Sequence, residues 1–216
     1  MLEIDSIRFS YRLTPVLNGV ECTLRTGEIF GILGRNGSGK TTFFRIVMGI
    51  IACRQGQVRF NHNIIKTRHR VFGYLPQHSF LFRHERVGKI IRMFYPRDGR
   101  SREKIEGDDR IKNRLKLKYG GLSGGEKRYL EALLILHLDR PFILLDEPFM
   151  ELEPMERKSL SALIKEKSAR SGVIVTDHAY RDVLAVADRI SILKDGRLHH
   201  LSDARSELRG FGYLPR

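Results

Sequence analysis

Short apolar runs separated by glycines and polar turns dominate the first third of the chain. Apolar and polar residues alternate between residues 2 and 9 and again between 20 and 24, a pattern typical of half-buried strands. Residues 28–33 read Glu-Ile-Phe-Gly-Ile-Leu, which predicts a strand buried on both faces. Glycines follow at once, and residues 41–48 then fit a helix. The sequence therefore predicts a strand, a glycine-rich loop and a helix in direct succession.

The middle of the chain changes character. Strands are expected at 57–60 and 71–75, after which residues 83–118 become polar, basic and helical in pattern. The run Tyr95-Pro96-Arg97-Asp98-Gly99 interrupts this stretch, because proline and glycine together favour a loop. We interpret residues of about 80–138 as a helical lobe inserted into the body of the domain.

Strand and helix patterns alternate again in the last third. The expected elements, in order, are a helix at 126–138, a buried strand at 142–145, a helix at 155–169, a strand at 173–175, a helix at 180–187 and a hairpin joining 190–193 to 197–201. Asp195-Gly196 is the two-residue signal for that hairpin. The whole pattern predicts one α/β domain over residues 1–216 with a mainly parallel sheet, an antiparallel portion and the inserted helices.

Composition adds a strong positive charge to this picture. The chain has 216 residues, 41% of them hydrophobic, and a formal net charge of +14. No apolar run approaches the roughly 20 residues of a membrane-spanning helix. The composition is therefore that of a globular domain of the cytosol. Much of the basic excess lies between residues 66 and 118, where it either attracts phosphate, nucleic acid or anionic membrane, or forms a solvated cationic face.

The cysteines and histidines show no ligand spacing. Cys22 and Cys53 are far apart and belong to no C-x-x-C pair, so we expect two buried thiols rather than a disulfide or metal site. His199 and His200 are adjacent in sequence, which favours a solvated pair.

The glycine-rich loop after residues 28–33 matches the complete phosphate-binding pattern G-x-x-x-x-G-K-T. Its members are Gly34, Arg35, Asn36, Gly37, Ser38, Gly39, Lys40 and Thr41, followed by Thr42. Backbone N–H groups of such a loop curl around phosphate oxygens, and the following helix adds the positive end of its dipole. Lys40 is expected to reach the β- and γ-phosphates and the Thr41 hydroxyl to bind Mg²⁺. The sequence thus predicts an ATP site.

Two carboxylates follow the buried strand at 142–145. Asp146 and Glu147 would lie at the carboxyl end of a parallel sheet, where ligands bind. Asp146 can hold Mg²⁺, and Glu147 is then placed to polarise an attacking water.

A second anion-binding helix start is expected at Ser123. Leu122-Ser123-Gly124-Gly125-Glu126 contains the capping-box pattern Ser-x-x-Glu, with two glycine amides at the helix N-terminus. One chain would then carry two separate phosphate-binding surfaces. This arrangement suggests two chains closing head to tail over shared nucleotides.

These motifs together resemble the ABC-type ATPase family over nearly the whole chain. In family order the matches are Tyr11 as the adenine-stacking aromatic, Gly34 to Thr41 as Walker A, Gln77 as the Q-loop glutamine, Ser123 to Glu126 in the signature motif, Asp146 as the Walker B aspartate, Glu147 as the catalytic glutamate and His178 as the switch histidine. The resemblance implies catalytic roles for Glu147, His178, Lys40 and Gln77. It also implies nucleotide contacts from residues 34–42, Tyr11, Ser123 and Gly125, and Mg²⁺ contacts from Thr41, Gln77 and Asp146.

One motif departs from the family pattern. Where the family reads Ala-Leu-Asp-Pro after Walker B, this chain reads Glu151-Leu152-Glu153-Pro154. Glu153 keeps the charge and adds a methylene, so contacts across the dimer through this loop are altered. We expect ATPase activity to survive this change.

The resemblance implies the ATPase subunit of a multi-subunit membrane transporter, dimeric and peripheral on the cytoplasmic face of the cell membrane. Gln77 and the helical lobe would receive an integral membrane subunit. One alternative is an ABC ATPase acting on nucleic acid or ribosomes, but about 45 residues between Gln77 and Ser123 leave no room for a long coiled coil. Only one nucleotide-binding unit is present, and nucleic acid is therefore an unlikely partner. A cofactor-assembly ATPase stays open, as do cargo, direction and homo- against heterodimer.

Overall fold

The computed structural model describes residues 1–178, 180–201, 207, 208 and 210. The strands are β1 (Leu2–Tyr11), β2 (Thr14–Leu24), β3 (Ile29–Leu33), β4 (Gln55–Phe60), β5 (Asn63–Ile64), β6 (Phe72–Leu75), β7 (Phe142–Asp146), β8 (Gly172–Asp177), β9 (Arg189–Lys194) and β10 (Arg197–His200). The α-helices are α1 (Lys40–Val47), α2 (Arg68–Val71), α3 (Val87–Phe94), α4 (Gly99–Glu106), α5 (Gly124–Leu136), α6 (Pro154–Ser168) and α7 (Tyr180–Val186), with 3-10 turns at Lys112–Arg114 and Tyr119–Gly121.

The larger sheet is parallel except at one edge. Its strand order is β10-β9-β3-β8-β7-β6, and only the β10–β9 pair is antiparallel. Every residue of β3, β7 and β8 is buried, as expected for strands covered on both faces. Asp195 and Gly196, with φ of 50° and 72°, form the turn between β9 and β10, so the predicted hairpin is confirmed.

The smaller sheet is antiparallel, with strand order β2-β1-β4-β5. The turn from β4 to β5 passes through Asn61 and His62, both left-handed with φ of 49° and 66°. The sequence pattern did not reveal this hairpin, because the second turn position is a histidine rather than the usual glycine. The predicted α/β fold with a mainly parallel sheet and an antiparallel portion is otherwise confirmed.

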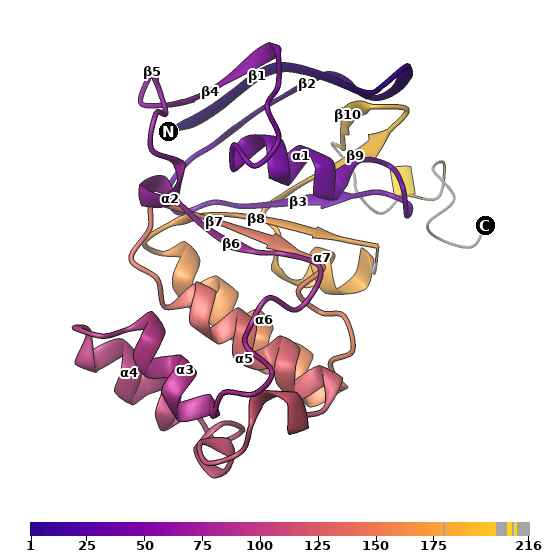
Figure 1. Ribbon diagram of the computed structural model, residues 1–216. Helices are drawn as coiled ribbons and strands as arrows, with labels where there is room; N and C mark the ends of the chain where they lie inside the picture. The colour runs from indigo at the N-terminus through magenta and orange to yellow at the C-terminus, as the bar shows by residue number, and fades with distance from the viewer. Residues whose placement is uncertain (179, 202–206, 209, 211–216) are drawn as a thin grey trace.

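Two hydrophobic clusters divide the interior into layers. One lies between the two sheets, where α1 contributes Phe43, Phe44 and Val47. The other covers the opposite face of the parallel sheet, where α5, α6 and α7 pack. Figure 1 shows α1 enclosed between the sheets and α3 and α4 outermost, beyond α5. Helices therefore cover both faces of the parallel sheet, and its carboxyl edge is left for side chains at the strand ends.

Some local expectations change in detail. The stretch 83–118 holds two short α-helices, α3 and α4, which the predicted interruption at 95–99 separates, and 3-10 and irregular turns follow them. The helix expected at 126–138 runs over Gly124–Leu136 because Ser123 caps it. Cys22 is buried as expected, but Cys53 is only partly buried, and both are free thiols. His200 is exposed, with Nδ1 2.8 Å from Ser191 Oγ.

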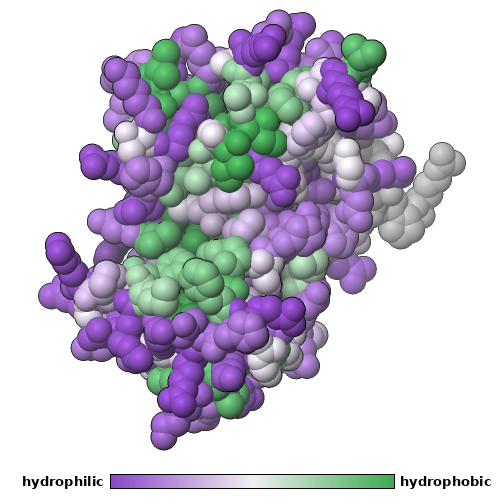
Figure 2. Space-filling model, viewed as in Figure 1, coloured by the Kyte–Doolittle hydropathy of each residue, from purple (hydrophilic) through white to green (hydrophobic). Residues whose placement is uncertain are grey.

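The surface reflects the charge of the chain. On the face shown in Figure 2 hydrophilic residues predominate, and hydrophobic residues gather in separate patches. Within the described part of the chain, no helix combines the length and apolarity needed to cross a bilayer.

Candidate nucleotide-binding site

The loop before α1 contains two glycines with left-handed backbone and leads directly into the helix start. Gly39, the N-cap, has a φ of 104°, and Gly37 has a φ of 81°, backbone conformations that glycine adopts readily. A glycine at the N-cap offers no side chain to the first amides, and the first turn holds no acidic residue. Ser38 Oγ is buried and has no hydrogen-bond partner among the described residues. These groups suit an external anion.

Lys40 lies buried at the start of α1, with only 5% of its surface exposed. Its ammonium donates a hydrogen bond of 2.7 Å to Gly34 O and lies 3.8 Å from Glu147 Oε1. Burial lowers the pKa of the Lys40 ammonium, and the charge of Glu147 opposes that shift. A desolvated cation within reach of the loop is well placed to bind phosphate.

Asp146 and Glu147 end the central strand β7 in a buried position. Thr176 Oγ1 donates 2.8 Å to Asp146 Oδ1, and Tyr74 OH lies 3.5 Å from Oδ2. Burial raises the pKa of the Asp146 carboxyl, while the hydrogen bond from Thr176 opposes it. Glu147 has a left-handed backbone with φ of 52°, and its N–H donates 2.8 Å to Thr176 O. Such strained residues concentrate at functional sites.

Gln77 joins the phosphate loop to the carboxylates. Its Oε1 lies 3.5 Å from Thr41 Oγ1, and its Nε2 donates 3.0 Å to Glu147 Oε2. All these groups border one hollow of about 300 Å³. Its lining residues are Tyr11, Val16, Asn36, Gly37, Ser38, Gly39, Lys40, Thr41, Thr42, Gln77 and Glu147. The structure thus brings residues of four predicted motifs to one place.

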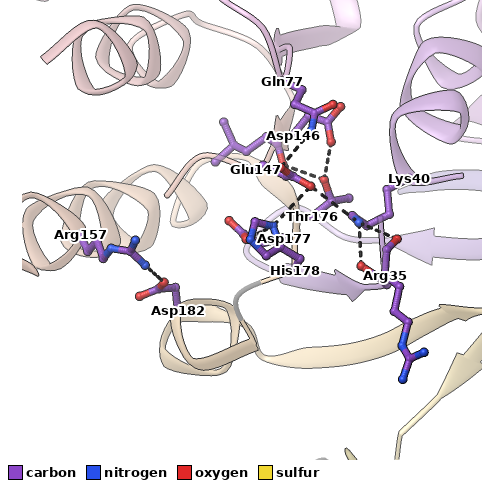
Figure 3. Close-up of polar contacts among 12 residues, drawn as sticks. Arg35, Lys40, Gln77, Asp146, Glu147, Arg157, Thr176, Asp177, His178 and Asp182 are labelled. Atoms are coloured by element: carbon purple, nitrogen blue, oxygen red, sulfur yellow. Dashed lines mark hydrogen bonds and ion pairs between the residues drawn. The ribbon is translucent and has the colours of Figure 1, made fainter. Parts of the chain in front are cut away.

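His178 approaches the same carboxylate from below in Figure 3. Its Nδ1 lies 3.6 Å from Glu147 Oε1 and 3.5 Å from Asp177 Oδ1. Helix α7, which begins two residues later, is held to α6 by the ion pair between Arg157 and Asp182.

Not every predicted site residue lines the hollow. Arg35 instead lines a neighbouring hollow of about 520 Å³, and Gly34 packs behind the loop against Ser38. Asp146 is 0% exposed and lies just beneath the hollow. Tyr11 is 47% exposed at its rim, with its ring edge-to-face against Phe9.

The oxygen donors present fit a magnesium ion. Thr41 Oγ1 and Gln77 Oε1 lie 3.5 Å apart. Neighbouring ligands of an octahedral Mg²⁺ at ~2.1 Å lie about 3 Å from one another, so small side-chain shifts suffice. The carboxylate of Asp146 would be the third donor. Mg²⁺ favours such sparse sets, because water and phosphate complete its shell.

The predicted signature surface lies elsewhere, at the start of α5. Ser123 Oγ accepts 3.1 Å from the Glu126 N–H, and Glu126 Oε2 accepts 2.9 Å from the Ser123 N–H, so the predicted capping box is present. Neither Ser123 nor Gly125 is among the described residues that line the hollow. The carboxylate of Glu151 lies over Gly124 so closely that a Cβ there would overlap Oε2.

Comparison with known proteins agrees with this arrangement. The ABC transporter family profile matches residues 17–150. An uncharacterised ABC transporter ATP-binding protein of Rhizobium meliloti is 35% identical, over 88% of this chain and 75% of its own length. Lipopolysaccharide export system ATP-binding proteins of Acidithiobacillus ferridurans and Escherichia coli K12 are 33% and 34% identical, over 92% and 91% of this chain and 88% of their lengths.

The chain belongs to the ABC transporter ATP-binding subunits. A solved ATP-binding subunit of an ABC transporter superposes with a TM-score of 0.86 over 99% of this chain and 94% of its own, at 24% identity, and supports the fold. This ABC protein is therefore a nucleotide-binding ATPase subunit of a transporter that works with membrane components. The predicted family membership and transport function are confirmed.

Two features of this ABC subunit were not foreseen from its sequence. Glu153, the residue that departs from the family pattern, caps α6, and its N–H donates 2.9 Å to Glu156 Oε2. Arg128 on α5 is 4% exposed and donates to the carbonyls of both Asp146 and Glu147. The only local signal was a basic residue on the apolar face of α5.

Proposed function

We propose that this ABC subunit hydrolyses ATP in a pair of chains. Each nucleotide would lie between the phosphate loop of one chain and Ser123 and Gly125 of the other. Lys40 would bind the terminal phosphates, and Tyr11 would stack on the adenine. Two observations support this proposal. The N-cap glycine of α1 offers no capping side chain, and the start of α5 is not among the described residues that line the hollow beside α1. A single chain therefore does not bring its two anion-binding surfaces together.

Glu147 is proposed to orient and polarise the attacking water. The observation that carries this role is its buried carboxylate, 3.8 Å from Lys40 Nζ and 3.0 Å from Gln77 Nε2 in one hollow. His178, 3.6 Å away, is proposed to contact the γ-phosphate. Most of the catalysis would come from positioning and charge, as is usual in phosphoryl transfer.

Thr41, Gln77 and Asp146 are proposed to hold Mg²⁺ through their oxygens. The bound ion would neutralise charge on the phosphates. The Asp146 carboxylate must then be ionised, although burial raises its pKa. A nearby divalent cation would offset that shift.

The membrane subunit is proposed to dock on Gln77 and the inserted helical lobe at about residues 80–138. Phe80 and Phe82, just after Gln77, are 39% and 63% exposed, which suits a protein contact in this region. The subunit would then lie peripherally at the inner face of the cell membrane. Basic residues of the lobe would be near anionic headgroups.

Size-exclusion chromatography of Glu147→Gln tests the paired mechanism. With Mg-ATP we expect a stable dimer, because nucleotide binds but is not hydrolysed. Glu147→Gln combined with Lys40→Ala should stay monomeric under the same conditions. A single variant that binds Mg-ATP and yet elutes as a monomer at every concentration would contradict the proposal.

A further inference from the structure

Arg128 is a buried charged side chain that the proposed chemistry does not use. It lies on the second turn of α5 with 4% of its surface exposed. Burying a guanidinium is costly unless its donors are all satisfied. Burial lowers the pKa of Arg128, and the charge of Glu131 opposes the shift, yet an arginine stays protonated at any ordinary pH. The location of its hydrogen bonds therefore shows what the fold gains from this charge.

The guanidinium donates to backbone carbonyls of two loops. Nη1 donates 2.7 Å to Pro76 O, the residue before Gln77. Nη2 donates to Asp146 O and, at 3.0 Å, to Glu147 O, and Nε lies 3.3 Å from the same Glu147 oxygen. One planar group thus joins the loop that carries Gln77 to the loop that carries Glu147.

These bonds act on a strained residue. Glu147 has φ of 52°, a conformation that is strained for a non-glycine residue and persists only when its surroundings fix it. Thr176 O accepts its N–H, and Arg128 binds its carbonyl on the other side. The direction of the Glu147 carboxylate therefore depends on the place of Arg128.

Glu131 extends the network outward. It is 0% exposed, and its Oε2 lies 3.5 Å from Arg128 Nη1. Its Oε1 accepts 2.6 Å from Tyr119 OH and 3.2 Å from the Phe80 N–H. Phe80 belongs to the partly exposed segment after Gln77, and Tyr119 precedes the signature serine by four residues. A continuous chain of polar contacts thus runs from this surface segment to Glu147.

We propose that Arg128 is a positioning residue for hydrolysis, which with Glu131 ties the backbone of Glu147 to the segment that begins at Gln77. The inference rests on the proposed function, because it requires Glu147 to act on the attacking water. Arg128 is not among the described residues that line the hollow. Its removal should change the rate of hydrolysis and not the affinity for nucleotide.

The test is Arg128→Lys in the 216-residue chain. Lysine keeps the charge but loses the planar fork that reaches several carbonyls at once. We expect kcat to fall about 10- to 100-fold, as for a displaced catalytic group. Mg-ATP affinity, measured with a fluorescent analogue, should stay within about twofold, because Lys40 and the phosphate loop carry the binding.

Arg140→Lys is the matched control. Arg140 also donates to carbonyls, those of His69 and Asp139, but it lies at the opposite end of β7. It should leave kcat unchanged. Tyr119→Phe removes the hydroxyl that bonds both Glu131 and Ser79, at 2.6 and 3.0 Å, and serves if Arg128→Lys fails to fold. We expect about a two- to fivefold loss of kcat at unchanged affinity, since a hydrogen bond to the Glu131 carboxylate is lost while Arg128 stays in place.

Two results would overturn the inference. One is a folded Arg128→Lys or Tyr119→Phe that keeps the wild-type kcat. The other is a parallel loss of kcat and affinity that follows the loss of stability. The variant Glu147→Gln distinguishes a failure of this inference from a failure of the proposed function. If Glu147→Gln also keeps the wild-type kcat, the proposed role of Glu147 is wrong. If only the Arg128 variant keeps the wild-type kcat, the positioning role of Arg128 alone is wrong.

Discussion

The N-termini of helices α1 and α5 both carry backbone N–H groups that can bind an anion, but they differ in how their own chain caps them. At α1 the N-cap is Gly39, the first turn has no acid, and no side chain caps the amides. At α5 Ser123 and Glu126 cap the helix reciprocally, and the carboxylate of Glu151 lies over Gly124. The first helix start is thus prepared for an external anion, whereas the second is already satisfied by its own chain.

The carboxyl groups near the two helix starts also differ, because their pKa values are shifted in opposite directions. Burial raises the pKa of Asp146 beside α1. The ionised form of this carboxyl therefore destabilises the fold. The backbone N–H of Ser123 lowers the pKa of Glu126 at α5, so this acid stabilises the fold. The α1 region is therefore suited to ligands at the expense of stability, whereas the α5 region is a well-capped helix that, in the proposed dimer, would still have to receive a ligand from outside.

The largest expected contrast is between lysines in the first turns of the two helices. Lys40→Met should weaken Mg-ATP binding at least about 100-fold, or ~2.7 kcal/mol, because a buried cation is lost from the phosphate site. Lys127→Met, at the fourth position of α5, should change it less than about threefold, since this partly exposed lysine is not among the described residues that line the hollow. Isothermal titration calorimetry measures both. Equal losses in the two variants would remove the distinction between the helix starts.

The two signature glycines should differ in stability. A Cβ at Gly125 would lie 2.8 Å from Glu151 O, so the backbone of the loop must move. At Gly124 the Cβ would meet only the mobile end of the Glu151 side chain. We expect Gly125→Ala to lose about 1–3 kcal/mol and Gly124→Ala to stay within about 1 kcal/mol of wild type. Urea unfolding gives both values, and the reverse order would show that Glu151 is fixed more firmly than its backbone.

The pH dependence of stability should have opposite signs at the two helix starts. Because the Asp146 pKa is raised in the fold, the native state binds its proton more tightly, and wild-type stability falls as pH rises above the ordinary value of 3.8. Asp146→Asn avoids that loss. We expect it to be about 1 kcal/mol more stable than wild type at pH 7, with the gap closing in acid.

Glu126→Gln should behave in the opposite way. The Glu126 pKa is lowered in the fold, so wild-type stability rises as the pH increases toward the ordinary value of 4.5. Above that pH the stabilising contribution of Glu126 is complete. The variant should therefore be about 1 kcal/mol less stable than wild type at pH 7, again with the gap closing in acid. Urea unfolding between pH 3.5 and 7 measures both variants, and gaps of the same sign would refute the contrast.

What the sequence could predict here was local. The phosphate loop, the Ser123 capping box and the Asp195-Gly196 hairpin each lie within a few residues, and the structure has all three. Apolar runs identified β3 and β7 because buried parallel strands have no polar face. The family resemblance assigned roles to both Gln77 and Glu147, but the hydrogen bond between them, across 70 residues, was seen only in the structure.

What the sequence missed was long-range or atypical. Arg128 meets Pro76, 52 residues away, and no periodic pattern encodes which carbonyls a buried guanidinium will reach. The placement of Glu151 over Gly124 depends on a left-handed backbone at residue 151, with φ of 61°, that glutamate rarely adopts. The Asn61-His62 turn was hidden for the same reason. Asp195 is also left-handed, with φ of 50°, but the glycine after it indicated the hairpin, whereas no glycine follows Glu151 or the Asn61-His62 pair.

The smallest expected effect concerns Glu151 itself. Its negative charge beside the start of α5 is favourable in a single chain, by about 0.3–1 kcal/mol, but it repels a phosphate brought by a second chain. In the Glu147→Gln background, Glu151→Gln should therefore strengthen ATP-dependent dimerisation by about two- to fivefold. Analytical ultracentrifugation across protein concentrations measures the dissociation constant. Glu166→Gln, which removes an equally negative but distant exposed side chain of α6, controls for net charge. If Glu151→Gln weakens the dimer, the Glu151 carboxylate contributes to the interface rather than competing with the nucleotide. The capping of α5 by its own chain would then be no obstacle to binding a phosphate there.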